Sequence, residues 1–224
     1  MFIFDDHLSS KKSGANTDMA NLDETFTQLN FTVQKYRNLN YDQFEMILET
    51  ISASNYGNVD SFAFVVLSHG EDNLITTRDG KKFEFDSFYH LLYENKSLEN
   101  KPKLFFVNSF RNKEYISQYE HEDFLRRSQS SYDNEERTAK KMLNTYWFYF
   151  VSYGMRAYLD EDESCGSFII STLCKHLKQN GKSKSFLTNL TDIVTELEKM
   201  RIINKKVQFE IDLDLFEIDL FFSD

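Results

Sequence analysis

Two uninterrupted apolar runs constrain the fold of this chain more than any other feature of its sequence. Residues 62–67 and 104–107 contain no polar side chain, and both runs are shorter than a typical buried helix. Runs of this length are typical of strands that are buried on both faces of a parallel sheet. Residues 146–151 form a third run of the same kind. Because helical patterns lie between these runs, the sequence predicts an α/β sheet that is covered by helices on both faces.

The hydrophobic periodicity predicts the remaining elements. Apolar stripes at helical spacing predict helices over residues 41–53, 166–179 and 184–201, and a further helix with Asn16 or Thr17 as its N-cap. Residues 31–36 alternate as a strand does, and Asp79-Gly80 between two short apolar segments predicts a hairpin turn.

The charge and composition exclude several classes of protein. The 224 residues carry a net charge of −10, which repels nucleic acid and anionic membranes, so neither is expected as a partner. No apolar run is long enough for a transmembrane helix, and the short, acidic start does not resemble a signal peptide. Two cysteines do not make a disulfide framework, so a reducing, cytoplasmic location is expected. The sequence contains no metal-ligand cluster, phosphate-binding loop or flavin motif, and we expect no cofactor.

One long segment has a different character from the rest. Residues 112–144 are rich in charge and serine, contain few apolar residues and show no clear period. Such a composition cannot bury enough apolar surface to pack. The sequence therefore predicts a linker inside a single domain of residues 1–224.

Residues 64–71 and 101–112 resemble the two catalytic motifs of caspases, the cysteine proteases that cleave after Asp. In that family one strand ends in Ser-His-Gly with the catalytic histidine, and another ends in Gln-Ala-Cys-Arg-Gly with the nucleophile. His69 matches the histidine. Further segments resemble the family in the same order along nearly the whole chain. The resemblance implies the caspase-like fold, a mostly parallel central sheet of about six strands with helices on both faces and a small hairpin.

The same resemblance divides the chain into the parts of a caspase. Residues 1–111 correspond to the large subunit, 112–144 to the intersubunit linker and 145–224 to the small subunit. A live caspase would have to cut this linker after Asp123 or Asp133, and the residues that follow are not the small ones that the family prefers. We therefore expect slow or absent processing.

The nucleophile position departs from the caspase pattern. Phe110 stands where the family has cysteine, and a phenyl ring cannot attack a carbonyl. Loss of the nucleophile of a triad-type protease costs roughly 10⁶-fold in rate. His69 then has no thiol to deprotonate, and we expect it to have a structural role. The resemblance thus implies a pseudocaspase, a caspase homologue that is not an enzyme.

We do not expect another residue to replace the missing nucleophile. Ser109 is adjacent to Phe110, but neighbouring side chains of a strand point to opposite faces, so it is expected to point away from His69. Cys174 lies on the apolar side of a helical stripe and is expected in the core. Cys165 follows an acidic run, which should raise the pKa of its thiol.

The substrate pocket that the resemblance implies has also changed. In caspases two arginines and a glutamine hold the substrate Asp, and here these positions carry Lys12, Asn108 and Glu161. Two charges 4 Å apart interact by about 4 kcal/mol at an effective dielectric near 20, so an acidic residue in place of Arg opposes an acidic substrate. The acidic run around Glu161 also fits a simple solvated loop.

The last predicted strand is the expected site of partner binding. Caspases dimerise by antiparallel pairing of their final strands, and here that strand comprises Val207, Gln208, Phe209, Glu210, Ile211, Asp212, Leu213, Asp214 and Leu215. In a symmetric pair the acidic residues lie near their own copies, which costs roughly 0.2–1 kcal/mol for each opposed pair. We therefore expect a heterodimer in preference to a homodimer, although charges on an edge strand also protect it from aggregation.

These features predict a non-catalytic regulator of an active caspase from the same organism. A complete scaffold can order the active-site loops of its partner, so activation is favoured over inhibition as a decoy. Two alternatives remain: an interaction module that uses the old substrate groove, and an active hydrolase with a non-standard nucleophile.

Overall fold

The computed structural model describes residues 1–6, 14–71, 74–84, 95–111, 145–153, 166–203, 209–213 and 220–222. The predicted linker therefore lies outside the described residues. The described strands are β1 (Phe2–Asp6), β2 (Gln34–Arg37), β3 (Phe62–Glu71), β4 (Leu74–Thr76), β5 (Lys82–Glu84), β6 (Lys103–Arg111), β7 (Thr145–Tyr153) and β8 (Phe209–Leu213). The helices are α1 (Gly14–Gln28), α2 (Tyr41–Ala53), α6 (Phe168–Asn180) and α7 (Phe186–Ile203), with a short 3₁₀ turn, η1 (Lys96–Leu98).

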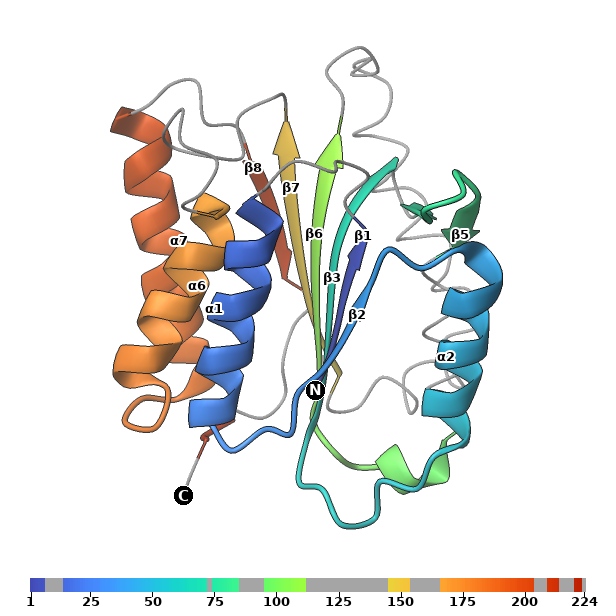
Figure 1. The fold of residues 1–224 in the computed structure, drawn as a ribbon. Coiled ribbons are helices and arrows are strands. Elements are labelled where there is room, and N and C mark those ends of the chain that lie inside the picture. Colours follow the sequence, from blue (N-terminus) through green and yellow to red (C-terminus); the bar gives the residue numbers. More distant parts are fainter. Residues whose placement is uncertain are drawn as a thin grey trace, which may run out of the picture.

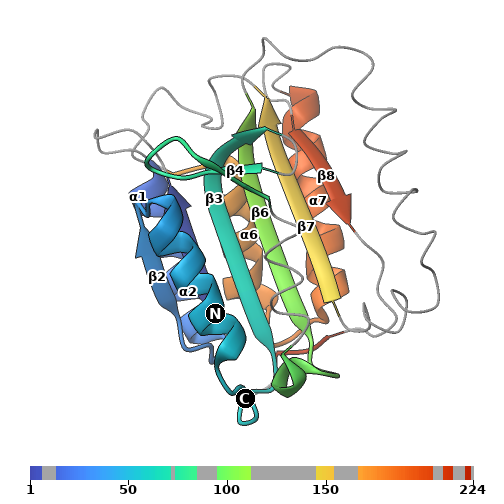
Figure 2. The same cartoon turned by 90° about the vertical axis from the view of Figure 1, so that its right-hand side faces the viewer.

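The strands form one sheet in the order β2-β1-β3-β6-β7-β8 (Figures 1 and 2). All neighbouring pairs on this path are parallel except β7 and β8, which are antiparallel. The strands β4 and β5 form a hairpin that pairs with the end of β3. This arrangement confirms the expected α/β class, with a mostly parallel sheet and a small hairpin.

Helices cover both faces of the sheet. Figure 1 shows α1, α6 and α7 on one face and α2 on the other. Residues of the central strands alternate between the two cores: Val65 and Phe106 belong to the core under α1, α6 and α7, whereas Phe64 and Phe105 belong to the core under α2. The apolar runs at residues 62–67 and 104–107 therefore are strands that are buried on both faces, as expected.

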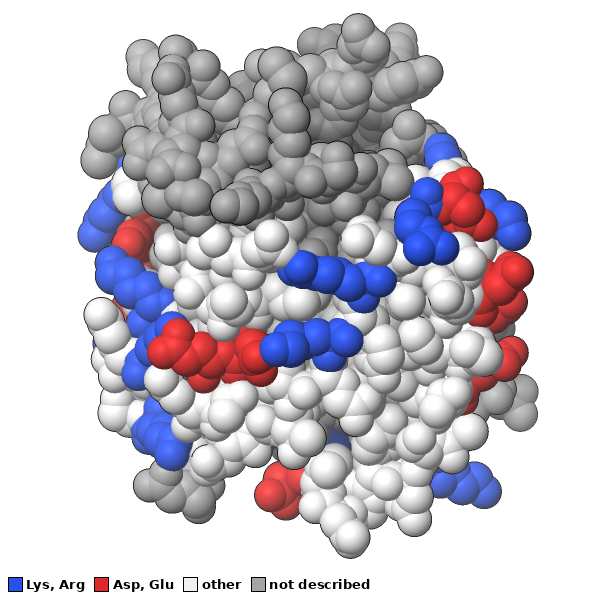
Figure 3. All heavy atoms as spheres, in the orientation of Figure 1, with Lys and Arg blue, Asp and Glu red and all other residues white. Residues whose placement is uncertain are grey.

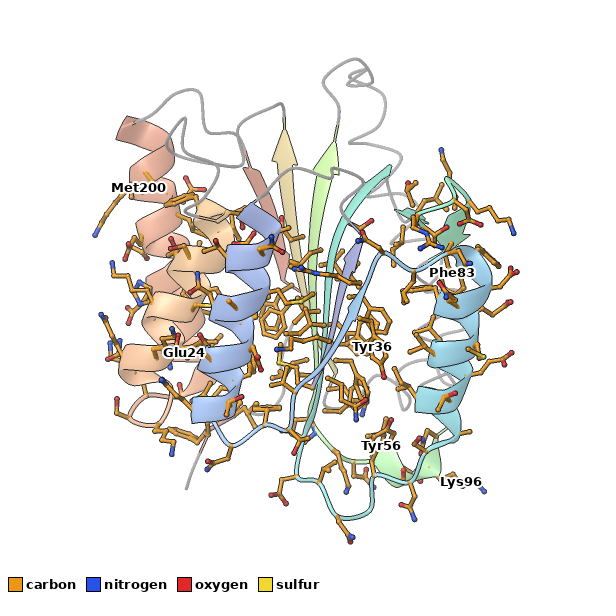
Figure 4. The ribbon with its side chains drawn as sticks, in the orientation of Figure 1. Glu24, Tyr36, Tyr56, Phe83, Lys96 and Met200 are labelled. Atoms are coloured by element: carbon orange, nitrogen blue, oxygen red, sulfur yellow. The ribbon has the colours of Figure 1, made fainter. Side chains whose placement is uncertain are left out.

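Aromatic rings fill both cores. On the α7 side, Phe148 stacks on Phe106 with ring centroids 4.8 Å apart and meets Phe186 edge-on at 5.3 Å. On the α2 side, Tyr36 stacks on Phe4 at 4.9 Å (Figure 4). Offset and edge-to-face pairs of this kind contribute about 0.5–1.5 kcal/mol beyond their buried area. Aromatic side chains thus join neighbouring strands to one another and also join helices to the sheet.

Helix α2 matches the range expected from the sequence. Its N-cap Asn40 accepts a hydrogen bond from the backbone of Gln43 at 2.9 Å, and the Gln43 side chain accepts one from the backbone of Asn40 at 3.1 Å. This capping box satisfies two backbone donors at the start of the helix.

Several expected boundaries were wrong. Helices α6 and α7 each begin two residues later than expected and end one or two residues later. Helix α1 begins at Gly14 and not after Asn16 or Thr17, and Ala15 and Asp18 of its first turns are almost fully buried. Tertiary packing thus extends this helix beyond its local cap signal. The second strand begins at Gln34 and not at residue 31. Phe31 packs edge-on against Phe26 of α1, and strand pairing starts with the residues after it.

Charged side chains are mixed in sign on the side of the molecule where β2 and α1 lie in front. Figure 3 shows described Lys and Arg side chains close to Asp and Glu on this side. Lys35 pairs with Asp23, and Lys178 of α6 pairs with Glu24 of α1 at 2.6 Å. Exposed pairs of this kind contribute at most about 1 kcal/mol each. Within the described ranges, no helix is long and apolar enough to cross a membrane.

Candidate functional site at the carboxyl ends of the central strands

The two catalytic positions of the caspase pattern lie side by side at the ends of β3 and β6. The parallel register pairs His69 with Phe110, and the preceding pair is Ser68 with Ser109. Binding sites of open parallel sheets lie outside the carboxyl ends of their strands, which is where these residues are. Phe110, and not Ser109, is therefore the register partner of His69. The side chains of residues 69, 109 and 110 lie outside the described part of the structure.

Asn108 is a buried polar residue just before these positions. Its side chain is 1% exposed, and its register partners are Leu67 of β3 and Phe150 of β7. Neither the amide oxygen nor the amide nitrogen has a hydrogen-bond partner in the structure as far as it is described. An unsatisfied buried polar group of this kind costs about 1–3 kcal/mol. Lys12 and Glu161, the other two predicted pocket positions, lie outside the described residues, so the predicted three-residue pocket stays a prediction.

A buried hydrogen bond joins the amino-terminal part of α1 to the N-cap of α6, near the carboxyl ends of these strands. The carboxylate of Asp18 accepts a hydrogen bond from the backbone N–H of Ser167 at 2.7 Å. Gly166 has a φ of +78°, and a Cβ atom there would lie 2.6 Å from the same carboxylate oxygen. The side chain of Ser167 caps α6 by accepting from the backbone of Ile170 at 3.3 Å. No local sequence pattern predicts that Ser167 binds Asp18, because the two residues are 149 positions apart.

The β4–β5 hairpin is fixed to α2 by Asp79. Its carboxylate accepts hydrogen bonds from the hydroxyl of Thr77 at 2.6 Å and from the backbone N–H of Tyr41 at 3.0 Å. The Thr77 hydroxyl lowers the pKa of this carboxyl below its usual value. Ser68 reaches the hairpin as well, because its hydroxyl donates to the backbone oxygen of Thr76 at 3.4 Å. The hairpin predicted from Asp79-Gly80 is confirmed, and its strand β4 pairs with the end of β3.

The one described cysteine has no catalytic environment. Cys174 is 3% exposed, and its burial raises the pKa of the thiol to about 12. A thiol that is protonated at neutral pH is a poor nucleophile. The expectation that Cys174 belongs to the core is therefore confirmed, whereas Cys165 lies outside the described residues. Among the described side chains, no three His, Cys, Asp or Glu residues are grouped as metal ligands are.

The predicted partner-binding strand is at the edge of the sheet. The structure describes residues 209–213 of it as β8, which pairs on one side with β7 in a register that places Ile211 beside Phe150. An edge strand has unpaired backbone groups that can bind another strand. Val207, Gln208, Asp214 and Leu215 lie outside the described residues, as do the side chains of β8 itself.

The sheet order, the helices on both faces and the adjacent His69 and Phe110 positions define an α/β protein of caspase-like architecture. The Caspase domain family model matches residues 3–211, and the chain therefore belongs to the caspase family. It is 28% identical to mouse caspase-3 over 199 residues, which cover 86% of this chain and 69% of that protein. It is 27% identical to the Drosophila melanogaster caspase drICE over 184 residues, or 80% of this chain and 52% of drICE. Its identity to mouse caspase-6 is 26% over 201 residues, or 86% of this chain and 72% of that protein.

Proposed function

We propose that this chain is a non-catalytic caspase homologue that regulates an active caspase of the same organism. It does so by forming a heterodimer through β8, and it activates its partner in preference to inhibiting it. The observation that carries the proposal is the identity of the register partner of His69. That partner is Phe110, whose ring has no nucleophilic atom.

The composition of the carboxyl-terminal segment supports a partner other than a second copy. Residues 207–224 contain six acidic residues and no Lys or Arg. In a two-fold pair of β8 strands centred on Ile211, Glu210 lies opposite Asp212 of the mate, and this happens twice. A caspase whose last strand is neutral or basic avoids this repulsion.

The extent of the scaffold favours activation over inhibition. The described residues include the whole path of the sheet and helices on both of its faces. Pairing with such a scaffold can order the active-site loops of a live protomer, which is how dimerisation acts in the family. A truncated scaffold would be better suited to a decoy.

The test is a titration of active caspases from the same source with this protein. Cleavage of a fluorogenic peptide that ends in Asp is followed at increasing ratios, with this protein alone as the blank. We expect a rate that rises with the added protein above a flat blank. A falling rate would make the protein a decoy inhibitor, and turnover in the blank would show an active hydrolase. No change with any caspase would leave the groove-binding module as the better explanation.

The state of the linker is read from the same mixtures. We expect the chain to migrate as one intact band after prolonged incubation with active caspase, because the residues after Asp123 and Asp133 are Phe and Asn. Rapid conversion into two fragments would instead make processing part of the regulation.

A further inference from the structure

Exposed apolar side chains identify a second surface at the β8 end of the molecule. In the described part of the chain, the large hydrophobic residues that are exposed are Met46, Val59, Leu187 and Phe221. Leu187 is 44% exposed and is the second residue of α7. The first residue of this helix, Phe186, contacts Phe148 of β7, so α7 covers the β7 and β8 side of the sheet (Figures 1 and 2).

The direction of this surface follows from the phase of α7. Its buried side is formed by Phe186, Leu190, Ile193 and Leu197. Another side faces α6, because Glu196 binds Lys175 at 2.8 Å. At 100° per residue, Leu187, Thr191 and Val194 lie together on the flank that faces away from α6. Because α6 lies between α1 and α7, this flank is on the β8 side of the helical layer.

The size of β8 shows why such a flank is needed. Five residues at about 3.4 Å each give an edge roughly 17 Å long, and a sheet layer is about 10 Å thick. The edge therefore presents on the order of 170 Å², whereas a stable interface buries about 800 Å² on each partner. Most of the area of any stable dimer through β8 has to come from the elements beside that strand.

We infer that the α7 flank, formed by Leu187, Thr191 and Val194, is the second half of the surface that binds the caspase partner. The inference rests on the proposed function, since the same partner pairs with β8. Glu198 follows at the same helical phase, so the charge-free part of this flank is the part formed by Leu187, Thr191 and Val194. Asp192, next to it in sequence, is paired with Lys184 at 2.7 Å. The surface of the partner that faces these three residues is therefore apolar and uncharged, in contrast to the neutral or basic strand that faces β8.

The test compares two exposed apolar positions on opposite faces of the sheet. Leu187→Glu places a charge on the α7 flank, and Met46→Glu places the same charge on α2, where Met46 is 60% exposed. Affinity for purified active caspases of the same source is measured with the full chain immobilised. We expect Leu187→Glu to weaken binding at least tenfold and Met46→Glu to change it less than twofold. Thr191→Glu, also at an exposed position, should act as Leu187→Glu does, with unchanged unfolding midpoints in all three variants.

The possible outcomes distinguish the inference about the α7 flank from the proposed function on which it rests. If the wild-type chain binds caspase and the Leu187→Glu variant binds equally well, the inference about the α7 flank is wrong. The proposed heterodimer is then unaffected. Equal losses in Leu187→Glu and Met46→Glu also overturn the inference, because the effect would then be one of net charge. A wild-type chain that binds no caspase overturns both the proposed function and the flank.

Discussion

The carboxylate of Asp18 accepts a hydrogen bond from the backbone N–H of Ser167, a residue 149 positions further along the chain. This bond joins two distant parts of the chain, α1 and the N-cap of α6, near the strand ends that carry His69 and Phe110. It is buried, and Gly166 next to it has no side chain that would displace the carboxylate. The two parts are therefore held together by polar contacts as well as by the apolar core.

Removal of this contact should destabilise the fold. We expect Asp18→Ala to lower the free energy of unfolding by about 2–3 kcal/mol, because a hydrogen bond to a charged group is lost and a buried N–H is left without its acceptor. Gly166→Ala should also destabilise, since its φ is positive and the added Cβ meets the carboxylate. Asp23→Ala, which removes an exposed ion pair, should cost less than about 1 kcal/mol. Urea unfolding measures all three, and equal effects of Asp18→Ala and Asp23→Ala would contradict the role of the buried bond.

Two buried asparagines should respond in opposite ways to substitution by leucine. Asn108→Leu removes an amide that has no described partner, and we expect it to stabilise the fold by about 1 kcal/mol. The amide of Asn189 donates to the backbone oxygen of Ser185 at 3.0 Å, so Asn189→Leu should destabilise it by at least about 1 kcal/mol. Thermal unfolding monitored by circular dichroism distinguishes the two. A destabilised Asn108→Leu variant would mean that the amide makes a stabilising hydrogen bond in the folded state.

The thiol of Cys174 should be protected in the folded protein. Burial raises its pKa from 9.0 to about 12, so in a Cys165→Ser background we expect no alkylation by iodoacetamide at pH 8 and full alkylation in urea. The unfolded thiol loses its proton at lower pH than the folded one, so this group's contribution to stability falls as the pH rises from 9.0 towards about 12. Cys174→Ala should lack this part of the pH dependence. Rapid alkylation of the native protein would contradict the buried environment.

Restoration of the nucleophile alone should not restore a protease. We expect Phe110→Cys to leave an Asp-ending fluorogenic peptide uncleaved, because the predicted pocket has Lys12 and Glu161 at the positions of the family's two arginines. A variant that combines Phe110→Cys with Lys12→Arg and Glu161→Arg provides the comparison. Turnover by Phe110→Cys alone would show that the pocket still accepts Asp.

The charge pattern of β8 should control self-association. In a pair centred on Ile211, Glu210→Lys converts two opposed acidic pairs into two attractive ones. A gain of about 0.2–1 kcal/mol for each pair, together with the repulsion removed, should tighten the homodimer about tenfold. The variant with both Glu210→Lys and Asp212→Lys restores like charges and should behave as the wild type does. Sedimentation velocity at low salt measures the three, and no difference among them would exclude this strand as the dimer contact.

Much of the fold was predictable because it depends on local chemistry. The apolar runs that became β3 and β6 have no polar face, and only a sheet covered on both sides can bury them. Asn40 and the apolar stripe after it are a complete local signal for α2, and Asp79-Gly80 is the local signal for the β4–β5 hairpin. The start of α1 was misplaced because Asp18 and Ala15 are buried by residues far away in the sequence, which no local pattern records.

The sequence by itself determined the sheet-forming segments and the family resemblance, and it predicts that Phe110 stands at the nucleophile position. These depend on side-chain chemistry and on short-range periodicity, which are complete within a few residues. Only the tertiary structure decided that Phe110 is the register partner of His69, that Asp18 binds Ser167 and that α7 lies over the β8 side of the sheet. Each of these relationships joins segments that are far apart in the chain, and strand register and helix packing are set by the burial of both segments together.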